Sequence, residues 1–136
     1  MGEIPEPLKY ERNMDVTTIS NGIRVCTERN PLSPVQAVGV FIGAGSRNET
    51  LESSGAAHFL EHLHFKGTRN RSRYQLEMGV EAAGSQLNAY TSREHTLYHM
   101  LGFNGSLAAN CEILGDMLTN SIYDNWALEM EKETIW

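Results

Sequence analysis

The sequence is organised around residues 55–67, which read GAAHFLEHLHFKG. Residues three and four positions apart share one face of a helix, so a helix here would point His58, Glu61 and His62 in the same direction. Two neutral imidazoles four residues apart are a natural pair of zinc ligands. A carboxylate beside them that is not itself a ligand can act as the general base of a metal-assisted hydrolysis.

A structural explanation competes with this one. Apolar side chains interleave with the histidines, so the segment could be a core helix with polar interruptions: Phe59, Leu60, Leu63 and Phe65. Three polar side chains would, however, be costly to bury without partners. The order H-x-x-E-H reverses the commoner H-E-x-x-H string and marks the inverzincin group of metallopeptidases. We therefore favour a metal site.

Composition and charge describe an ordinary globular protein. The 136 residues fit one domain, with 40% hydrophobic and 21% charged residues, and no apolar run approaches the length of a membrane span. A formal charge of −6 argues against nucleic acid as the main partner. Cys26 and Cys111 are too few for a disulfide framework, so we expect a reducing compartment. Cys111 lies on an apolar helical stripe, which predicts a packing role.

The first residues form a polar lead segment, assigned to positions 1–14, ahead of a domain at 15–136. The lead contains several acidic residues and two prolines, MGEIPEPLKYERN, and therefore resembles neither a secretory signal nor an Arg-rich transit peptide. An organelle address would have been removed, lie elsewhere or not exist.

The first half of the chain predicts strands and then the motif helix. An Asn-Gly pair at positions 21 and 22 separates strand-like runs at 15–20 and 23–27, which predicts a β-hairpin. Residues 30–34 read as a loop, and the apolar run 35–44 suits a central strand covered on at least one face. Ser53 or Ser54 is the expected cap of the motif helix.

The second half begins with a basic loop at 67–71, read most simply as a solvated turn. A capping box of Ser72 and Gln75 opens the next helix, which closes at Gly84. Its expected buried stripe is Leu76, Val80 and Ala83. Runs at 86–91 and 94–103 predict a second hairpin with its tip at positions 92 and 93.

Two further helices complete the pattern. The first has apolar residues at helical spacing: Leu107, Cys111, Leu114, Leu118 and Ile122. Asp124 or Asn125 caps the second, which continues to the last residue. The order ββ, β, α, α, ββ, α, α predicts an α+β fold in which helices pack on an antiparallel or mixed sheet.

Four segments carry a family resemblance: GAGSRNE, GAAHFLEHLHFKGT, LNAYTSREHTLY and ALEMEKETI. They resemble the N-terminal portion of pitrilysin-family metallopeptidases over residues 16–136. Within that family the similarity is closest to the β subunits of mitochondrial processing peptidases and to core protein 1 of respiratory complex III. The resemblance implies subunits of two similar α+β domains, of which this chain matches the first part of the first domain.

The resemblance also implies roles for individual residues. His58 and His62 would bind zinc, and Glu61 would activate water. Phe65 would help to form an aromatic pocket beside the cleaved bond. Asn88 and Ala89 would lie on a strand edge to which an extended substrate adds by main-chain hydrogen bonds.

The third zinc ligand is the main departure from the family pattern. A catalytic zinc takes three protein ligands. The resemblance implies that the third is a glutamate that follows His62 at the family's spacing, which would fall at about position 138, past Trp136. Glu131 matches a supporting acidic residue of the family that would act behind the ligands. A solvated carboxylate in a charged run is the alternative for Glu131.

Two imidazoles alone make an incomplete site, so we expect the isolated chain to be inactive. Either the sequence is a truncated piece, or the subunit is split and a second polypeptide supplies the glutamate. We favour the split subunit. The other histidines have modest interpretations: His64 is structural or exposed, and His95 and His99 are packing or hydrogen-bonding residues.

The expected function is that of the zinc-site portion of a processing-peptidase β-like subunit, which cleaves presequences from imported proteins. Its expected partners are the complementary chain, an α-like or core 2 subunit, other complex III subunits and basic presequence peptides. Its expected place is the matrix side of the mitochondrial inner membrane, with no transmembrane segment of its own. The alternatives are a non-catalytic core subunit of complex III and a free-standing zinc-binding domain.

Overall fold

The computed structural model describes residues 13–135, which divide after Ser33 into two units. Within this range no helix has both the length and the apolar character that crossing a bilayer requires.

The first unit is the predicted β-hairpin. Strands β1 (Met14–Thr18) and β2 (Arg24–Glu28) pair antiparallel. The Ile19 N–H donates to the Ile23 carbonyl at 3.0 Å, which closes a loop of three residues. The last of them, Gly22, has φ +88°, a left-handed conformation that glycine adopts without steric cost.

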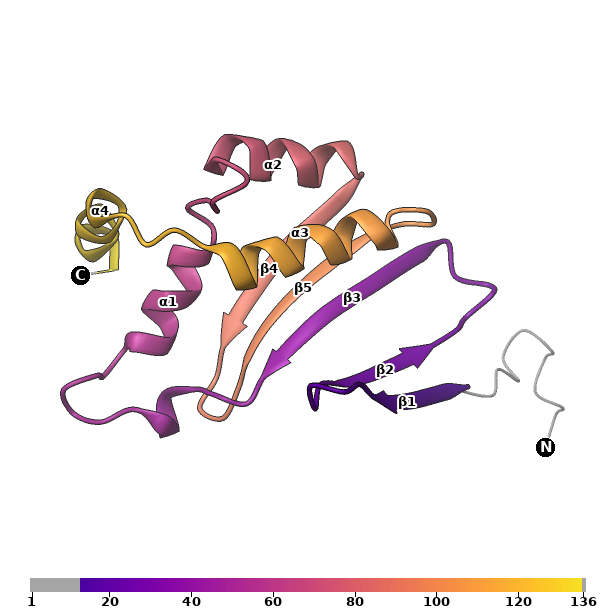
Figure 1. Ribbon diagram of the computed structural model, residues 1–136, viewed down its shortest axis with the longest axis horizontal. Coiled ribbons are helices and arrows are strands. Elements are labelled where there is room, and N and C mark those ends of the chain that lie inside the picture. Colours follow the sequence, from indigo (N-terminus) through magenta and orange to yellow (C-terminus); the bar gives the residue numbers. More distant parts are fainter. Residues whose placement is uncertain (1–12, 136) are drawn as a thin grey trace, which may run out of the picture. The chain divides into compact units, whose positions relative to one another are not determined.

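The second unit is built on a three-stranded antiparallel sheet, which confirms the predicted fold class. Its strands are β3 (Val35–Ile42), β4 (Ser85–Thr91) and β5 (Thr96–Phe103). The order is β3-β5-β4 (Figure 1). Of the described residues, none pairs with the outer edges of β3 and β4, so β3 is an edge strand and not the central strand that its apolar sequence suggested.

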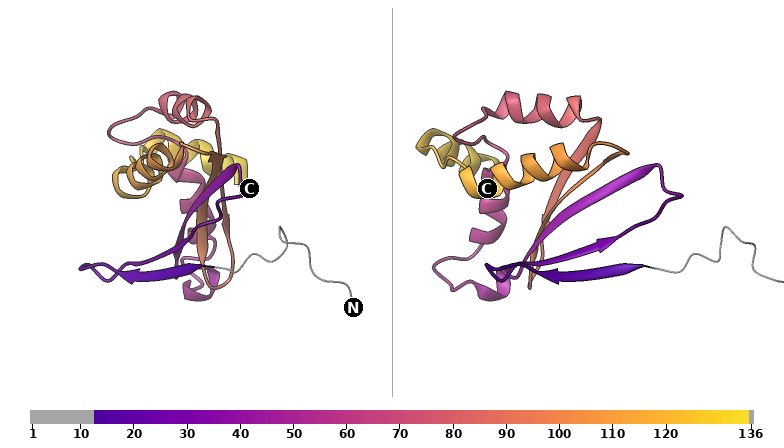
Figure 2. Two further views of the ribbon diagram at one scale, coloured as in Figure 1. Left: turned by 90° about the vertical axis from the view of Figure 1, so that its right-hand side faces the viewer. Right: turned by 45° about the vertical axis from the view of Figure 1, so that its right-hand side comes forward.

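In the described part of the second unit, four α-helices and one 3₁₀ turn connect and follow the strands: η2 (Ser46–Asn48), α1 (Ala56–His64), α2 (Arg73–Ala82), α3 (Leu107–Asn120) and α4 (Asn125–Ile135). Alternate residues of β5 are buried, because α2 and α3 pack on the same face of the sheet (Figure 2). The core that they form consists of Leu76, Val80, Tyr98, Met100, Ile113, Leu114 and Met117. The opposite face of the sheet is largely open among the described residues.

The start of α1 differs from the sequence prediction. Its N-cap is Gly55, with φ +87°, and neither Ser53 nor Ser54. The Glu49 carboxylate accepts hydrogen bonds from the Gly55 and Ala57 N–H groups, both at 2.8 Å. These hydrogen bonds lower the pKa of Glu49. The capping group therefore comes from outside the local sequence window that capping rules use.

At α2 and α4, the other two helices for which a cap was predicted, the helix start follows the sequence prediction. Ser72 and Gln75 form the expected capping box at the start of α2. At the start of α4, the Asp124 carboxylate accepts a hydrogen bond from the Trp126 N–H at 3.2 Å.

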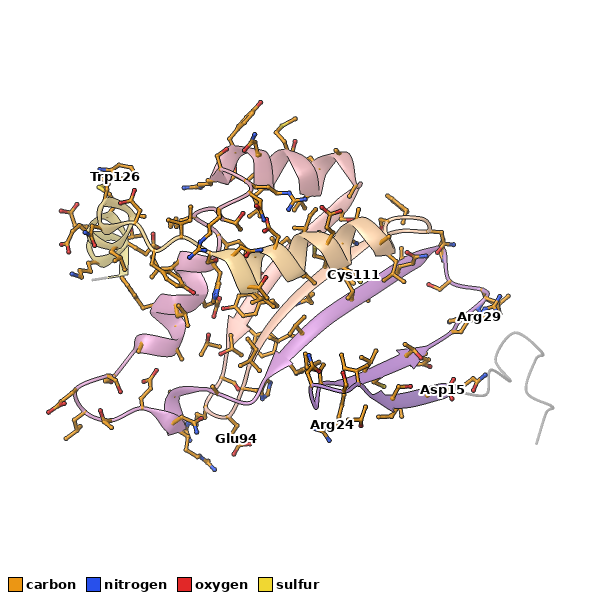
Figure 3. The ribbon with its side chains drawn as sticks, in the orientation of Figure 1. Asp15, Arg24, Arg29, Glu94, Cys111 and Trp126 are labelled. Carbon is orange, nitrogen blue, oxygen red and sulfur yellow. The ribbon has the colours of Figure 1, made fainter. Side chains whose placement is uncertain are left out.

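The buried face of α3 was predicted only in part: Leu114 lies in the core and Leu118 packs against it, but the rest of the predicted stripe is not buried. The buried residues of α3 are Asn110, Ile113, Leu114, Asp116 and Met117. Leu107, Cys111 and Ile122 are exposed (Figure 3 labels Cys111), so Cys111 has no packing role in this structure. Asn110 and Asp116 lie on the buried face, and because they are polar, a search for apolar periodicity does not identify this face.

The buried carboxylate of Asp116 is fully hydrogen-bonded, in part by residues of the loop at 67–71. The interpretation of this loop as a solvated turn is therefore wrong. The carboxylate accepts hydrogen bonds from Thr68 Oγ1 at 2.7 Å and Arg71 Nη1 at 2.7 Å. It also accepts from the side-chain amides of Asn70 at 2.5 Å and Asn120 at 2.9 Å. The loop that follows α1 is thereby fixed to α3.

This cluster predicts acid sensitivity. Burial acts to raise the pKa of Asp116, but the hydrogen bonds from Thr68, Arg71, Asn70 and Asn120 outweigh it and lower the pKa to about 2. The stabilisation by ionised Asp116 is complete above the ordinary value of 3.8 and is lost as the pH falls toward 2, because the unfolded chain takes up the proton first. We expect Asp116→Asn to lower the free energy of unfolding by about 3 kcal/mol at pH 7, measured by urea denaturation.

The matched control is Glu112→Gln. Glu112 contacts the same Arg71 at 2.6 Å, but its side chain is 71% exposed. Its removal should change the free energy of unfolding by about 0.5 kcal/mol. Equal effects of the two substitutions, or a stability of wild type that does not fall between pH 4 and 2, would contradict the role of Asp116.

Candidate metal centre

Helix α1 brings His58, Glu61 and His62 to one face, as the motif spacing predicts. The Nε2 atoms of His58 and His62 lie 3.1 Å apart, and the two rings are nearly perpendicular at 82°. Two unprotonated ring nitrogens would repel each other at this distance. The distance is that of a hydrogen bond in which one of the two rings carries the proton.

The separation of the two nitrogens suits a zinc ion. Two imidazoles bound to one tetrahedral zinc at 2.0–2.1 Å place their nitrogens about 3.3 Å apart. The set is nevertheless incomplete, because in the part of the chain from 13 to 135 no three His, Cys, Asp or Glu side chains converge as a metal-binding group. A third protein ligand would have to come from outside this range.

Glu131, on α4, lies directly behind His62. Its Oε1 is 2.6 Å from His62 Nδ1, and the residue is only 3% exposed. The alternative interpretation of Glu131 as a solvated carboxylate is therefore wrong. A hydrogen bond from Nδ1 to a carboxylate fixes the imidazole tautomer in which Nε2 carries the lone pair toward His58.

Lys66 completes this contact. Its Nζ lies 2.5 Å from Glu131 Oε2, so both carboxylate oxygens are occupied. Burial acts to raise the pKa of Glu131, but the hydrogen bonds from Lys66 and His62 outweigh it and keep the pKa below its ordinary value. Glu131 therefore stays ionised and balances the charge of Lys66. Lys66 was not singled out from the sequence, because it lies two residues past the end of α1, where helical spacing no longer applies.

Glu61 is buried, at 8% exposure, and its Oε2 accepts a hydrogen bond from Thr91 Oγ1. Thr91 is the last residue of β4 and was not singled out from the sequence. The alternation of side chains in a strand could have found it, because Thr91 shares the helix-covered face of β4 with Leu87 and Ala89.

A cavity of about 440 Å³ lies beside Glu61 and His62. Phe65, Asn88 and Ala89 line it, together with residues of α2, which brings the three expected substrate-contacting residues to one place. Asn88 and Ala89 belong to β4, an edge strand of the described sheet, as the strand-edge interpretation requires. The Ala89 N–H donates to Asn88 Oδ1 at 2.9 Å. An added strand would replace that bond.

His64 is structural. It is 5% exposed, its Nδ1 lies 2.7 Å from the Tyr98 hydroxyl, and its Nε2 lies 3.3 Å from the Tyr123 hydroxyl. Burial lowers the pKa of His64. The two tyrosines fix the end of α1 against the sheet and against the segment that leads to α4. The sequence offered a signal only for Tyr98, which lies on the covered face of β5.

His95 and His99 lie away from the motif histidines. His95 contacts Phe41 and Tyr90 at the tip of the β4–β5 hairpin. His99 is on β5, in the middle of the open sheet face, and its buried Nδ1 has no hydrogen-bond partner within residues 13–135. Neither shares a metal-binding group with His58 and His62 in this range.

Comparison with known sequences gives one family. The profile described as insulinase, peptidase family M16, matches residues 24–136. The mitochondrial-processing peptidase β subunit of Lentinula edodes is 46% identical over 121 residues, which is 89% of this chain and 26% of the relative. The ubiquinol-cytochrome-c reductase complex core protein I of Euglena gracilis is 44% identical over 130 residues, 96% of this chain and 26% of the relative.

A solved structure agrees with these sequence matches. The crystal structure of a protease from Helicobacter pylori superposes with a TM-score of 0.86 at 28% identity, over 93% of this chain and 30% of that one. The chain thus spans about a quarter of the length of the curated relatives named here.

Proposed function

The chain belongs to the insulinase family of peptidases, family M16, and from this membership we propose that it is the zinc-site portion of a mitochondrial processing-peptidase β-like subunit. The observation that carries the proposal is the 3.1 Å separation of the His58 and His62 Nε2 atoms, with Glu131 behind His62. Residues 15–136 would form the first part of a zinc-peptidase domain that a further segment completes.

The roles of the residues follow from their contacts. His58 and His62 hold the metal through Nε2, Glu131 orients His62, and the third ligand is an acidic residue outside residues 13–135. Zinc, when bound, supplies Lewis-acid activation of the scissile carbonyl. Glu61 takes the proton of the attacking water and then delivers it to the leaving amine.

The surroundings of Glu61 support a peptide substrate. An extended peptide would add to the free edge of β4 at Asn88 and Ala89, and a side chain next to the cleaved bond would enter the cavity beside Phe65. Basic presequences of imported proteins are the proposed substrates, and the formal charge of −6 favours their approach. The proposed location is the matrix side of the mitochondrial inner membrane, with an α-like or core 2 subunit as partner.

A second candidate function is that of a non-catalytic core subunit of respiratory complex III. The observation that favours it is the match to the Euglena gracilis core protein I over 96% of this chain. The intact His58, Glu61 and His62 favour the peptidase. The two functions are compatible within one complex.

Metal removal tests the peptidase function. We expect the purified assembly that contains this chain to cleave a synthetic basic presequence, to lose cleavage with a zinc chelator, and to regain it when zinc is returned. The isolated chain should not cleave, because two ligands do not complete the site. Cleavage that survives complete removal of zinc would contradict the proposal. An assembly that does not cleave even with zinc would also contradict it, and would favour the second candidate, a non-catalytic core subunit.

A further inference from the structure

Thr91 occupies a fixed position at the end of β4. Side chains alternate along the strand, so Thr91 follows Leu87 and Ala89 on the face that the helices cover. The strand ends here because Ser92 forms a tight turn: its Oγ donates to the His95 carbonyl at 2.8 Å and accepts from the His95 N–H at 3.1 Å. The backbone of Thr91 pairs with Thr96 across the hairpin.

The hydroxyl of Thr91 donates to one oxygen, Oε2, of the buried Glu61 carboxylate. The other oxygen, Oε1, is not enclosed and has no hydrogen-bond partner in the described range. Glu61 also lines the cavity of about 440 Å³. One oxygen of the carboxylate is therefore anchored, and the other is available.

This arrangement suits a general base. A glutamate side chain has three rotatable bonds, and it must give up that freedom before it can accept a proton in one direction. An anchor on one oxygen removes the freedom in the ground state, so that the second oxygen needs no rearrangement during the reaction. Thr91 is also on the strand whose free edge is proposed to bind the peptide, which links the base and the substrate to one rigid element.

We propose that Thr91 is a positioning residue for Glu61, which it holds in the geometry for proton transfer. The inference rests on the proposed peptidase function and adds to it a residue that the motif does not contain. Thr91 would act through Glu61 and would contact neither the metal nor the cleaved bond.

The test compares Thr91→Val and Thr91→Ser in the complete, zinc-loaded assembly, with a presequence peptide as substrate. Valine has the shape of threonine without the hydroxyl, so we expect kcat to fall by about tenfold to a hundredfold. KM, zinc content and the thermal midpoint should not change, because the strand edge and the ligands are intact. Serine restores the hydroxyl and should restore kcat.

The matched control is Thr96→Val. Thr96 lies opposite Thr91 on the same face of the sheet, is 6% exposed, and donates its hydroxyl to the Ala44 carbonyl at 3.0 Å. The substitution removes a buried hydroxyl that does not touch Glu61, and kcat should keep its wild-type value.

Three results would overturn the role of Thr91: an unchanged kcat in Thr91→Val, a fall in kcat that serine does not restore, or a parallel loss of zinc content and thermal midpoint. The last result would show that the Thr91 hydroxyl stabilises the fold and does not position Glu61. Failure of the peptidase function itself is distinguished by the wild type and Glu61→Gln. If the wild type does not cleave, or if Glu61→Gln cleaves at the wild-type rate, there is no general base for Thr91 to position.

Discussion

Glu61→Gln is expected to abolish presequence cleavage by the complete assembly while zinc content stays at the wild-type level. The amide has nearly the shape of the carboxylate and can still accept a hydrogen bond from Thr91, but it cannot take a proton from water. General-base catalysis contributes about 10²–10⁴-fold, so kcat should fall by at least a hundredfold. Peptide cleavage and zinc analysis of the same preparation measure the two quantities.

Glu133→Gln is the control for this substitution. Glu133 is an exposed residue of α4 and does not line the cavity beside Glu61. Its replacement removes the same charge and should leave both cleavage and zinc unchanged. Retained cleavage in Glu61→Gln would exclude Glu61 as the base, and loss of zinc would indicate that Glu61 is a ligand.

Zinc affinity should fall more when a ligand is removed than when the residue behind His62 is changed. His62→Ala and His58→Ala each remove one of two imidazole ligands, and we expect zinc affinity to fall by more than a hundredfold in either variant. Glu131→Gln leaves both ligands and should weaken binding by about 10–100-fold, because the neutral amide accepts a weaker hydrogen bond from His62 Nδ1 and can also turn its NH₂ toward that nitrogen. Competition against a zinc indicator gives the affinities.

The order of these effects distinguishes ligands from supporting residues. A larger loss in Glu131→Gln than in His62→Ala would make Glu131 a ligand itself. His95→Ala is the matched control, since His95 contacts only Tyr90 and Phe41 among the aromatic residues of the described range. It should bind zinc as the wild type does.

The sequence predicted those features that are encoded over a few neighbouring residues. The spacing of His58, Glu61 and His62 determines that they share a helix face, and the structure places them there. The Asn-Gly turn and the capping box at Ser72 were likewise found because each is a local interaction with a known residue pattern.

Features that depend on contacts between distant segments were not predicted. The Glu49 carboxylate caps α1 from outside the helix, and Asp116 is buried because four donors from two segments converge on it. Thr91 and Lys66 have no unusual local pattern. Each becomes significant only when the fold brings it to Glu61 or Glu131. Periodicity rules assume that polar residues face water, and Asp116 shows where that assumption fails.

The most direct test of the zinc assignment is the X-ray absorption spectrum of the zinc in the complete assembly. The account predicts two imidazole nitrogens at about 2.0–2.1 Å with oxygen ligands making up the rest, and one imidazole fewer in His62→Ala. A spectrum without imidazole ligands, or one that is the same in wild type and His62→Ala, would contradict it.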